Sequence, residues 1–183
     1  MNNSRHVLLD RDGVINYDSD EFIKSPDEWR ALEGSLQAIA LLNQQGYQVS
    51  VITNQSGVSR GLFDLSTLEA IHNKMRAELA VYGGELAAIY YCPHGPDSEC
   101  LCRKPKPGMM YAFQQATQIP FNDVYVIGDA WRDIQTAVAV GAKPILVKTG
   151  KGLQTLAAHP EIAIPIFENL YAAAEYIITQ QKL

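Results

Sequence analysis

The chain has 183 residues, of which 47% are hydrophobic and 19% are charged, a length and composition that fit a single folded domain over residues 1–183 and exclude a disordered or fibrous chain. Its net charge is −5, from 20 acidic and 15 basic residues, without the strongly basic surface of a nucleic-acid binder or the polybasic patch of a membrane-surface protein. The apolar runs are too short to span a bilayer, and the N-terminal sequence lacks a secretory hydrophobic segment. We therefore expect a cytoplasmic protein that binds neither nucleic acid nor membrane.

Short apolar runs alternate with helical periodicity along the chain. In chain order, we predict a strand at 7–9, a helix at 36–42 that ends at Gly46, and a strand at 48–53. A helix with a capping box at 66–69 follows and runs to Tyr82, and then come a strand at 87–91 and a helix at 108–118. The remaining elements are strands at 124–127, 144–147 and 164–167 and helices at 133–140 and 170–181. This alternation predicts an α/β domain with a doubly wound, mainly parallel sheet.

Chemically active side chains follow four of the predicted strands. In a doubly wound sheet the carboxyl ends of the strands form the ligand-binding edge, so we expect these side chains to converge there. They are Asp10 and Asp12 after the first strand, Thr53, Asn54, Gln55 and Ser56 after the second, a Cys/His segment leading to Arg103 and Lys104 after the third, and Asp129 after the fourth.

Carboxylates at this edge indicate a magnesium site. Asp10 and Asp12 are separated by one residue, so in an extended chain both can face one site, and Gly13 allows a sharp turn. Mg²⁺ relieves repulsion between neighbouring carboxylates and favours carboxylate, water and phosphate ligands. Asp129 is the expected third carboxylate. The hydroxyl of Thr53 and the cations Arg103 and Lys104 are suited to bind a phosphoryl group.

The three cysteines of the chain lie within one short segment that also contains a histidine. Cys92, His94, Cys100 and Cys102 supply four ligands, which are enough to complete a tetrahedral Zn²⁺ site. A structural zinc ion would order this loop (92–102) and fix Arg103 and Lys104 beside the site. We expect His72 to lie on a helix surface, and the Gly150–Gly152 turn is given no role.

With these residues placed, the chain resembles the haloacid dehalogenase-like phosphatases. Asp10-Arg-Asp12-Gly13-Val14 is similar to their first motif, Thr53-Asn54-Gln55 to the second, Lys104 to the third, and Gly128-Asp129 with Asp133 to the fourth. More narrowly, the chain is similar to the heptose 1,7-bisphosphate phosphatases, a capless branch, through the Thr53–Gly57, Arg60–Phe63, Cys92–His94, Cys100–Met109 and Thr149–Lys151 segments. Some members of this branch carry Lys directly after the fourth-motif Asp, where this chain has Ala130.

The resemblance implies an Mg²⁺-dependent phosphatase of a sugar bisphosphate, in nucleotide-activated heptose or lipopolysaccharide precursor synthesis. Asp10 is then the nucleophile and Asp12 the proton donor and acceptor. Thr53 and Lys104 stabilise the phosphoryl group, and Arg103 recognises the substrate. Mg²⁺ ligands are Asp10, Asp129 and the backbone carbonyl of Asp12. Further substrate contacts are expected at Asp18, Ser19, Asp20, Glu21, Asn54, Gln55 and Ser56, and the family implies a monomer.

Three alternatives remain at this stage. A histidinol-phosphate phosphatase would share the fold, the zinc loop and the first motif. A polynucleotide end phosphatase is disfavoured by the acidic net charge. A non-catalytic, zinc-stabilised binding module would be expected to lose the nucleophile or a metal ligand, yet Asp10, Asp12 and Asp129 are all present.

Overall fold

The computed structural model describes residues 5–180, and its centre is a six-stranded sheet of order β3-β2-β1-β4-β5-β6. Every neighbouring pair of strands is parallel. Most residues of the four inner strands are buried, as expected for a parallel sheet that is covered on both faces. The strands are β1 (Arg5–Leu9), β2 (Tyr47–Asn54), β3 (Ala88–Cys92), β4 (Val124–Gly128), β5 (Lys143–Val147) and β6 (Ile166–Phe167).

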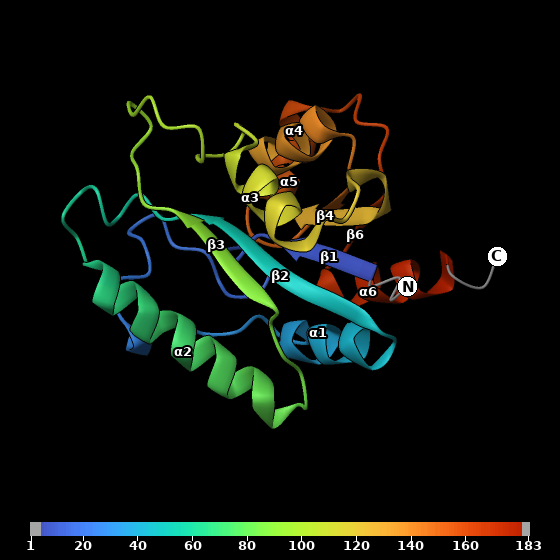
Figure 1. Cartoon of the computed structure of the whole chain (residues 1–183), viewed down its shortest axis with the longest axis horizontal. Coiled ribbons are helices and arrows are strands. Elements are labelled where there is room, and N and C mark those ends of the chain that lie inside the picture. The colour runs from blue at the N-terminus through green and yellow to red at the C-terminus, as the bar shows by residue number, and fades with distance from the viewer. Residues whose placement is uncertain (1–4, 181–183) are drawn as a thin grey trace.

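Helices cover both faces of this sheet, which confirms the predicted α/β fold class. Figure 1 shows α1, α2 and α6 on one side of the sheet and α3, α4 and α5 on the other. One apolar cluster joins α1, α2 and α6 to the sheet, and a second cluster joins α3 and α4 to the opposite face. The helices are α1 (Ser35–Gln44), α2 (Leu65–Val81), α3 (Gly108–Thr117), α4 (Trp131–Val140), α5 (Gly152–Ala158) and α6 (Leu170–Thr179), with 3-10 turns at Pro26–Glu28 and Phe121–Asp123.

Several predicted boundaries were wrong, and one helix was missed. Helix α2 begins at Leu65 because Asp64 is its N-cap and accepts a hydrogen bond from the Thr67 backbone N–H, so Ser66 does not open a capping box. Helix α4 begins at Trp131 instead of Asp133, and β6 contains only two residues. The seven-residue α5 occupies a segment that showed no helical periodicity long enough to predict it. The predicted end of the last helix at Gln181 lies outside the described residues.

The order of the strands places the functional edge. The chain winds outward from β1 through β2 to β3 and then returns to β4 on the other side of β1, so the direction of winding reverses between β1 and β4. The Asp10 backbone N–H donates to the Ile127 carbonyl at 3.0 Å and holds the ends of these two strands together. A ligand site is expected at such a switch point, beyond the carboxyl ends of the strands.

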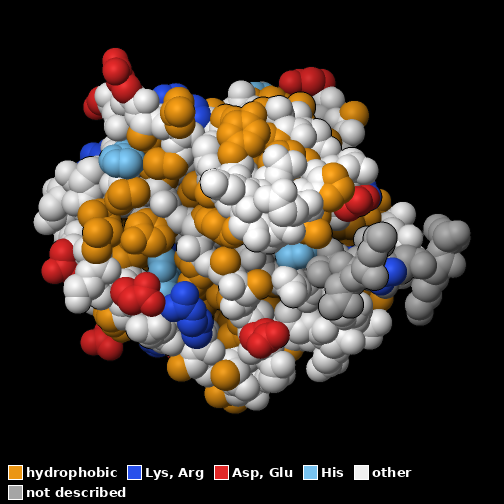
Figure 2. Space-filling model, in the orientation of Figure 1, with side chains coloured by type: hydrophobic (Ala, Val, Ile, Leu, Met, Phe, Trp, Pro, Cys, Tyr) orange, Lys and Arg blue, Asp and Glu red, His pale blue; other side chains and the backbone are white. Residues whose placement is uncertain are grey.

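Within residues 5–180, no helix combines the length and the apolarity needed to cross a bilayer. On the face shown in Figure 2, apolar side chains form small groups, and the Lys and Arg side chains are few and separated. Among the described residues of this face, therefore, there is no continuous basic track of the kind that binds a nucleic-acid backbone.

Candidate active site

Three buried carboxylates meet at the switch point of the sheet. Asp10 follows β1, Asp129 follows β4, and Asp133 lies in the first turn of α4. Ligand oxygens of the three residues all lie within 4.8 Å of one another. The structure therefore brings together the predicted pair Asp10 and Asp129, and it adds Asp133, which the sequence had placed only in a motif. The side chain of Asp12 lies outside this group.

The electrostatics of the three carboxylates fit a divalent cation. Burial, together with repulsion by Asp10 and Asp133, raises the pKa of Asp129 to about 8. Burial also raises the pKa of Asp10 to about 6, an effect that Asp133 strengthens and Lys104 opposes. The Asp129 Oδ1 atom is buried and has no hydrogen-bond partner among the described residues. A cation bound by these oxygens would supply the missing partner and relieve the repulsion.

Two glycines leave the space that Asp129 occupies. A Cβ on Gly13 would lie 2.1 Å from Asp129 Oδ2, and a Cβ on Gly150 would lie 2.2 Å from the same atom. Both residues also have positive φ angles, of +82° and +57°. The Lys151 backbone N–H donates to Asp129 Oδ2 at 2.7 Å. The Gly150–Gly152 turn, for which we expected no role in the site, thus helps to hold Asp129 in place.

Lys104 places a positive charge beside the carboxylates. Its Nζ atom lies 3.0 Å from Asp10 Oδ1 and 2.8 Å from Asp133 Oδ1, and it also donates to the Ile52 carbonyl. Burial favours the neutral amine, but Asp10 and Asp133 outweigh burial and raise the pKa of Lys104. Asn54 positions this residue, because its side-chain amide accepts from the Lys104 N–H at 3.0 Å and donates to the Lys104 carbonyl at 3.1 Å. Asn54 therefore binds the Lys104 backbone.

The carboxylate of Asp12 is held by hydrogen-bond donors on both oxygens. Asp12 Oδ2 accepts from Gln55 Nε2 at 2.8 Å, and Oδ1 accepts from Asn16 Nδ2 at 2.9 Å. Burial raises the pKa of Asp12, but the adjacent Arg11 guanidinium and these hydrogen bonds outweigh burial and lower it. Gln55 Nε2 also donates to Thr53 Oγ1 at 2.8 Å, which leaves the Thr53 hydroxyl proton for another acceptor.

A cavity of about 230 Å³ opens above Asp10 and Asp12. The predicted residues Asp18, Ser19, Asp20, Asn54, Gln55, Ser56 and Arg103 line it, together with Phe22, Ile23, Arg60, Arg132 and Lys151. Glu21, which was also predicted to contact the substrate, lies in a turn, is exposed and does not line the cavity. Lys151 Nζ lies 3.4 Å from Asp18 and 3.7 Å from Asp20, so the 18–20 segment is tied to the edge of the cavity.

Arg132 is a cavity-lining cation that was not predicted from the sequence, whereas Arg60 and Lys151 were noted only within segments that resemble the family. Arg132 lines the cavity from the first turn of α4, and its Nε atom is buried without a hydrogen-bond partner in the described part of the chain. Burial opposes its charge, but the surrounding carboxylates, Asp133 and Asp10 foremost, outweigh burial and raise its pKa. Its place in the first turn of the helix that follows the fourth motif does not by itself reveal that its side chain faces the cavity.

The predicted zinc ligands converge beside this cavity. Ligand atoms of Cys92, His94, Cys100 and Cys102 all lie within 4.8 Å of one another, and the three cysteines are free thiols. The Cys92 Sγ atom lies 3.6 Å from His94 Nδ1 and 3.7 Å from Cys100 Sγ. Sulfurs bound to one tetrahedral zinc at about 2.3 Å would be separated by about 3.8 Å, which the Cys92–Cys100 pair matches, whereas the Cys92 and Cys102 sulfurs, at 3.0 Å, would have to move apart to bind the ion. Arg103 Nη1 donates to the His94 carbonyl at 3.1 Å, which couples this loop to the cavity.

His72 was wrongly expected on a helix surface. It is buried, with 1% of its surface exposed, and its Nε2 atom lies 3.3 Å from Arg11 Nη1. His72 does lie on the predicted helix, but the apolar stripe of that helix did not reveal that the buried guanidinium of Arg11 faces His72.

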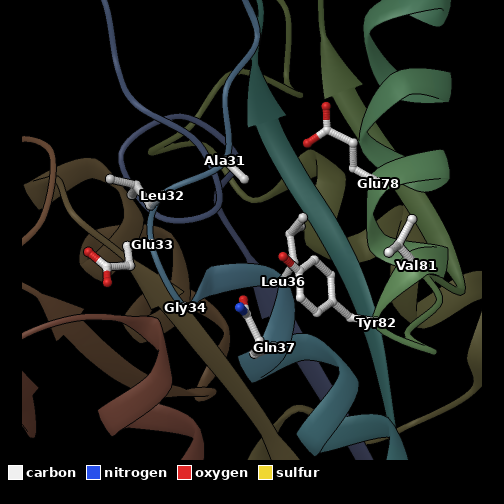
Figure 3. Close-up of a pocket in the computed structure, with 9 residues that line it drawn as sticks. All are labelled: Ala31, Leu32, Glu33, Gly34, Leu36, Gln37, Glu78, Val81 and Tyr82. Carbon is white, nitrogen blue, oxygen red and sulfur yellow. The ribbon is translucent and has the colours of Figure 1, made fainter.

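A second cavity, of about 390 Å³, lies away from these residues. Figure 3 shows it between the segment 31–34, the start of α1 and the end of α2, with Tyr82 near Leu36 and with Glu33 and Glu78 at its sides. Its lining carries no cation and no residue of the carboxylate cluster, and we assign it no role in the chemistry.

Comparison with known proteins agrees with this geometry. A family model described as "HAD-hyrolase-like" matches residues 101–173. The chain is 52% identical over 172 residues to the D-glycero-beta-D-manno-heptose-1,7-bisphosphate 7-phosphatase of Pseudomonas putida, covering 94% of this chain and 98% of that protein. A crystal structure of the D,D-heptose 1,7-bisphosphate phosphatase of Bordetella bronchiseptica, complexed with magnesium and phosphate, superposes with a TM-score of 0.93 at 50% identity, covering 96% and 99% of the two chains.

Proposed function

Since this chain belongs to the D-glycero-beta-D-manno-heptose-1,7-bisphosphate 7-phosphatase family, we propose that it removes the C7 phosphate of that bisphosphate in an Mg²⁺-dependent reaction. The observation that carries the proposal is the buried cluster of Asp10, Asp129 and Asp133 with Lys104, at the floor of a cavity that four cationic side chains line. The cluster with Lys104 suits the phosphoryl group that is transferred, and the four cations of the cavity suit a second anionic group of the same substrate.

The nucleophile of the proposed reaction is Asp10. Its carboxylate attacks phosphorus as the bond to the sugar oxygen breaks, so that an aspartyl-phosphate forms and the sugar oxygen leaves with a proton from Asp12. Water then attacks phosphorus and gives a proton to Asp12, and the bond between Asp10 and phosphorus breaks to release inorganic phosphate. The transferred group is held by Lys104 Nζ and by the free hydroxyl proton of Thr53.

Asp10, Asp129 and Asp133 would hold the magnesium ion. When bound there, Mg²⁺ neutralises negative charge on the phosphoryl group. The buried Oδ1 of Asp129, which has no hydrogen-bond partner in the described part of the chain, supports this assignment. The Asp12 backbone carbonyl stays a predicted further ligand.

Asp12 must change its protonation state during this reaction. Its hydrogen bonds favour the carboxylate in the free protein, which is the form that takes a proton from water in the second step. The proton for the first step is then supplied as substrate binds, because a phosphate monoester has a pKa near 6 and its charge raises the pKa of a neighbouring carboxyl.

Arg103 and Arg132 are the proposed receptors of the second phosphate. Both line the cavity, and the buried Nε atom of Arg132 has no hydrogen-bond partner within residues 5–180. Guanidinium groups bind phosphate with two parallel hydrogen bonds. Asp18, Ser19 and Asp20 are the proposed contacts of the sugar hydroxyls, and Ser56 lies on the same wall. The zinc ion of the Cys92–Cys102 loop has a structural role in this proposal, because four protein ligands leave no open position.

The test is phosphate release with Mg²⁺ from heptose 1,7-bisphosphate and, in parallel, from histidinol phosphate. We expect a strong preference for the bisphosphate with loss of one phosphate, from C7, because histidinol phosphate offers only one anion to a cavity lined by four cations. A preference for histidinol phosphate would contradict the substrate assignment and leave the phosphatase chemistry intact. Absence of Mg²⁺-dependent turnover of either compound would favour the non-catalytic binding module. A monomeric state and a cytoplasmic location stay predictions.

A further inference from the structure

A buried cation and a buried histidine lie directly behind Asp12. Arg11 has no exposed surface, and its Nη2 and Nε atoms lie 2.9 and 3.2 Å from Asp12 Oδ1. On its other side, Arg11 Nη1 lies 3.3 Å from Nε2 of His72, which comes from α2. A chain of contacts therefore runs from the middle of α2 through Arg11 to the carboxylate of Asp12.

His72 takes part in these contacts as a neutral hydrogen-bond acceptor. Burial, helped by the charge of Arg11, lowers the pKa of His72 to about 3. A guanidinium can only donate, so the Nε2 atom of His72 accepts and the ring proton lies on Nδ1. His72 thereby fixes the plane of the Arg11 guanidinium without adding a second charge to a buried site.

The hydrogen bonds divide the two oxygens of Asp12 into different roles. Oδ1 accepts from Arg11 and from Asn16 Nδ2, which occupies its lone pairs. Among the described residues Oδ2 accepts only from Gln55 Nε2, so it keeps a lone pair available, and Asp12 lines the cavity. Arg11 Nη2 also donates to Gln55 Oε1 at 3.2 Å, so the same guanidinium orients the partner of Oδ2.

We propose that His72, acting through Arg11, is a positioning residue that presents Oδ2 of Asp12 for proton transfer. This inference rests on the proposed function, in which the proton moves from Asp12 to the leaving sugar oxygen and returns from water. Without the acceptor on His72, the Arg11 guanidinium can rotate and the carboxylate loses its fixed orientation. Small misplacement of a catalytic group is enough to cost an order of magnitude or more in rate.

The experiment compares two substrates whose leaving groups differ in their need for a proton. A sugar oxygen must be protonated as it leaves, whereas p-nitrophenolate leaves without help. For both substrates kcat/KM reports the steps up to phosphoryl transfer to Asp10. For His72→Leu we expect kcat/KM to fall about tenfold with heptose 1,7-bisphosphate and less than about twofold with p-nitrophenyl phosphate. His72→Gln restores an acceptor and should recover most of the lost rate.

His6→Leu is the matched control, because His6 is an equally buried histidine that packs against Phe113 and not against the site. It should leave the ratio of the two kcat/KM values unchanged. If His72→Leu does not melt cooperatively, His72→Phe replaces it, since that ring fills the same space beside Tyr91 without an acceptor. Equal losses with both substrates, or no loss with either, would overturn the inference.

Asp12→Asn separates this inference from the proposed function. A large loss for the bisphosphate in Asp12→Asn combined with no selective loss in His72→Leu would refute the positioning role alone. Unchanged turnover of the bisphosphate in Asp12→Asn would refute proton transfer by Asp12 and the positioning role of His72 with it, and would leave the substrate assignment intact.

Discussion

Replacing Asp129 by Asn should stabilise the metal-free protein while abolishing its activity. The Asp129 carboxyl is buried beside Asp10 and Asp133, and its pKa rises from 3.8 to about 8. At pH 7 the unfolded chain ionises this group freely but the folded chain does not, which costs about 4 kcal/mol of folding free energy at 1.36 kcal/mol per pH unit. Asn carries no charge, and its oxygen can still accept from the Lys151 N–H. Allowing for relaxation around the carboxyl, we expect Asp129→Asn to raise the free energy of unfolding in EDTA by about 2–4 kcal/mol.

The pH dependence has a definite sign. The folded-state pKa of Asp129 lies above the unfolded value. The loss of folding free energy caused by this carboxyl is therefore absent below pH 4 and grows until about pH 8. The advantage of Asp129→Asn in EDTA should therefore shrink to below about 2 kcal/mol at pH 5. Saturating Mg²⁺ should stabilise the wild type and not the variant, since a ligand stabilises only the state that binds it.

Urea unfolding in EDTA and in Mg²⁺, at pH 5 and pH 7, measures these differences. Asp27→Asn, at an exposed position, is the matched control and should change stability by less than about 0.5 kcal/mol in either buffer. An Asp129→Asn variant less stable than the wild type in EDTA at pH 7 would refute the repulsion argument. Equal stabilisation of both proteins by Mg²⁺ would refute the placement of the ion at Asp129.

Asp10→Asn should abolish phosphate release while leaving the thermal midpoint no lower than that of the wild type, and activity at about a hundredth of wild type or more would exclude a covalent mechanism. Elemental analysis should find about one Zn²⁺ per chain. Cys100→Ala should lose that zinc together with bisphosphate turnover, because the loop that carries Arg103 is no longer fixed, and a zinc-free wild type of full activity would contradict the structural role. Arg132→Gln should raise the KM for the bisphosphate about tenfold and the KM for p-nitrophenyl phosphate less than about twofold. Arg30→Gln, at an exposed position, is the control. Parallel rises in KM for both substrates would show that Arg132 does not bind the second phosphate.

The sequence alone determined the layout of the protein. Continuous apolar runs identified the strands, and their alternation with helices predicted a parallel sheet, because strands buried on both faces need no polar alternation. The residues after each strand then identified Asp10, Asp129, Lys104 and the cysteine cluster, since parallel strands bring their carboxyl ends to one edge. These inferences depend only on local pattern and on chain direction.

Only the tertiary structure decided the contacts between side chains that are distant in sequence. Helical periodicity places His72 on a helix but cannot reveal that Arg11, 61 residues away, is buried against it. Arg132 was missed because its role depends on which side of α4 faces the cavity. Likewise, Gly150 is a turn in the sequence and acquires its function only where Asp129 fills the space that a side chain would take. A pattern along one chain specifies directions and periods, whereas burial, pKa shifts and shared hydrogen bonds arise when separate elements pack together.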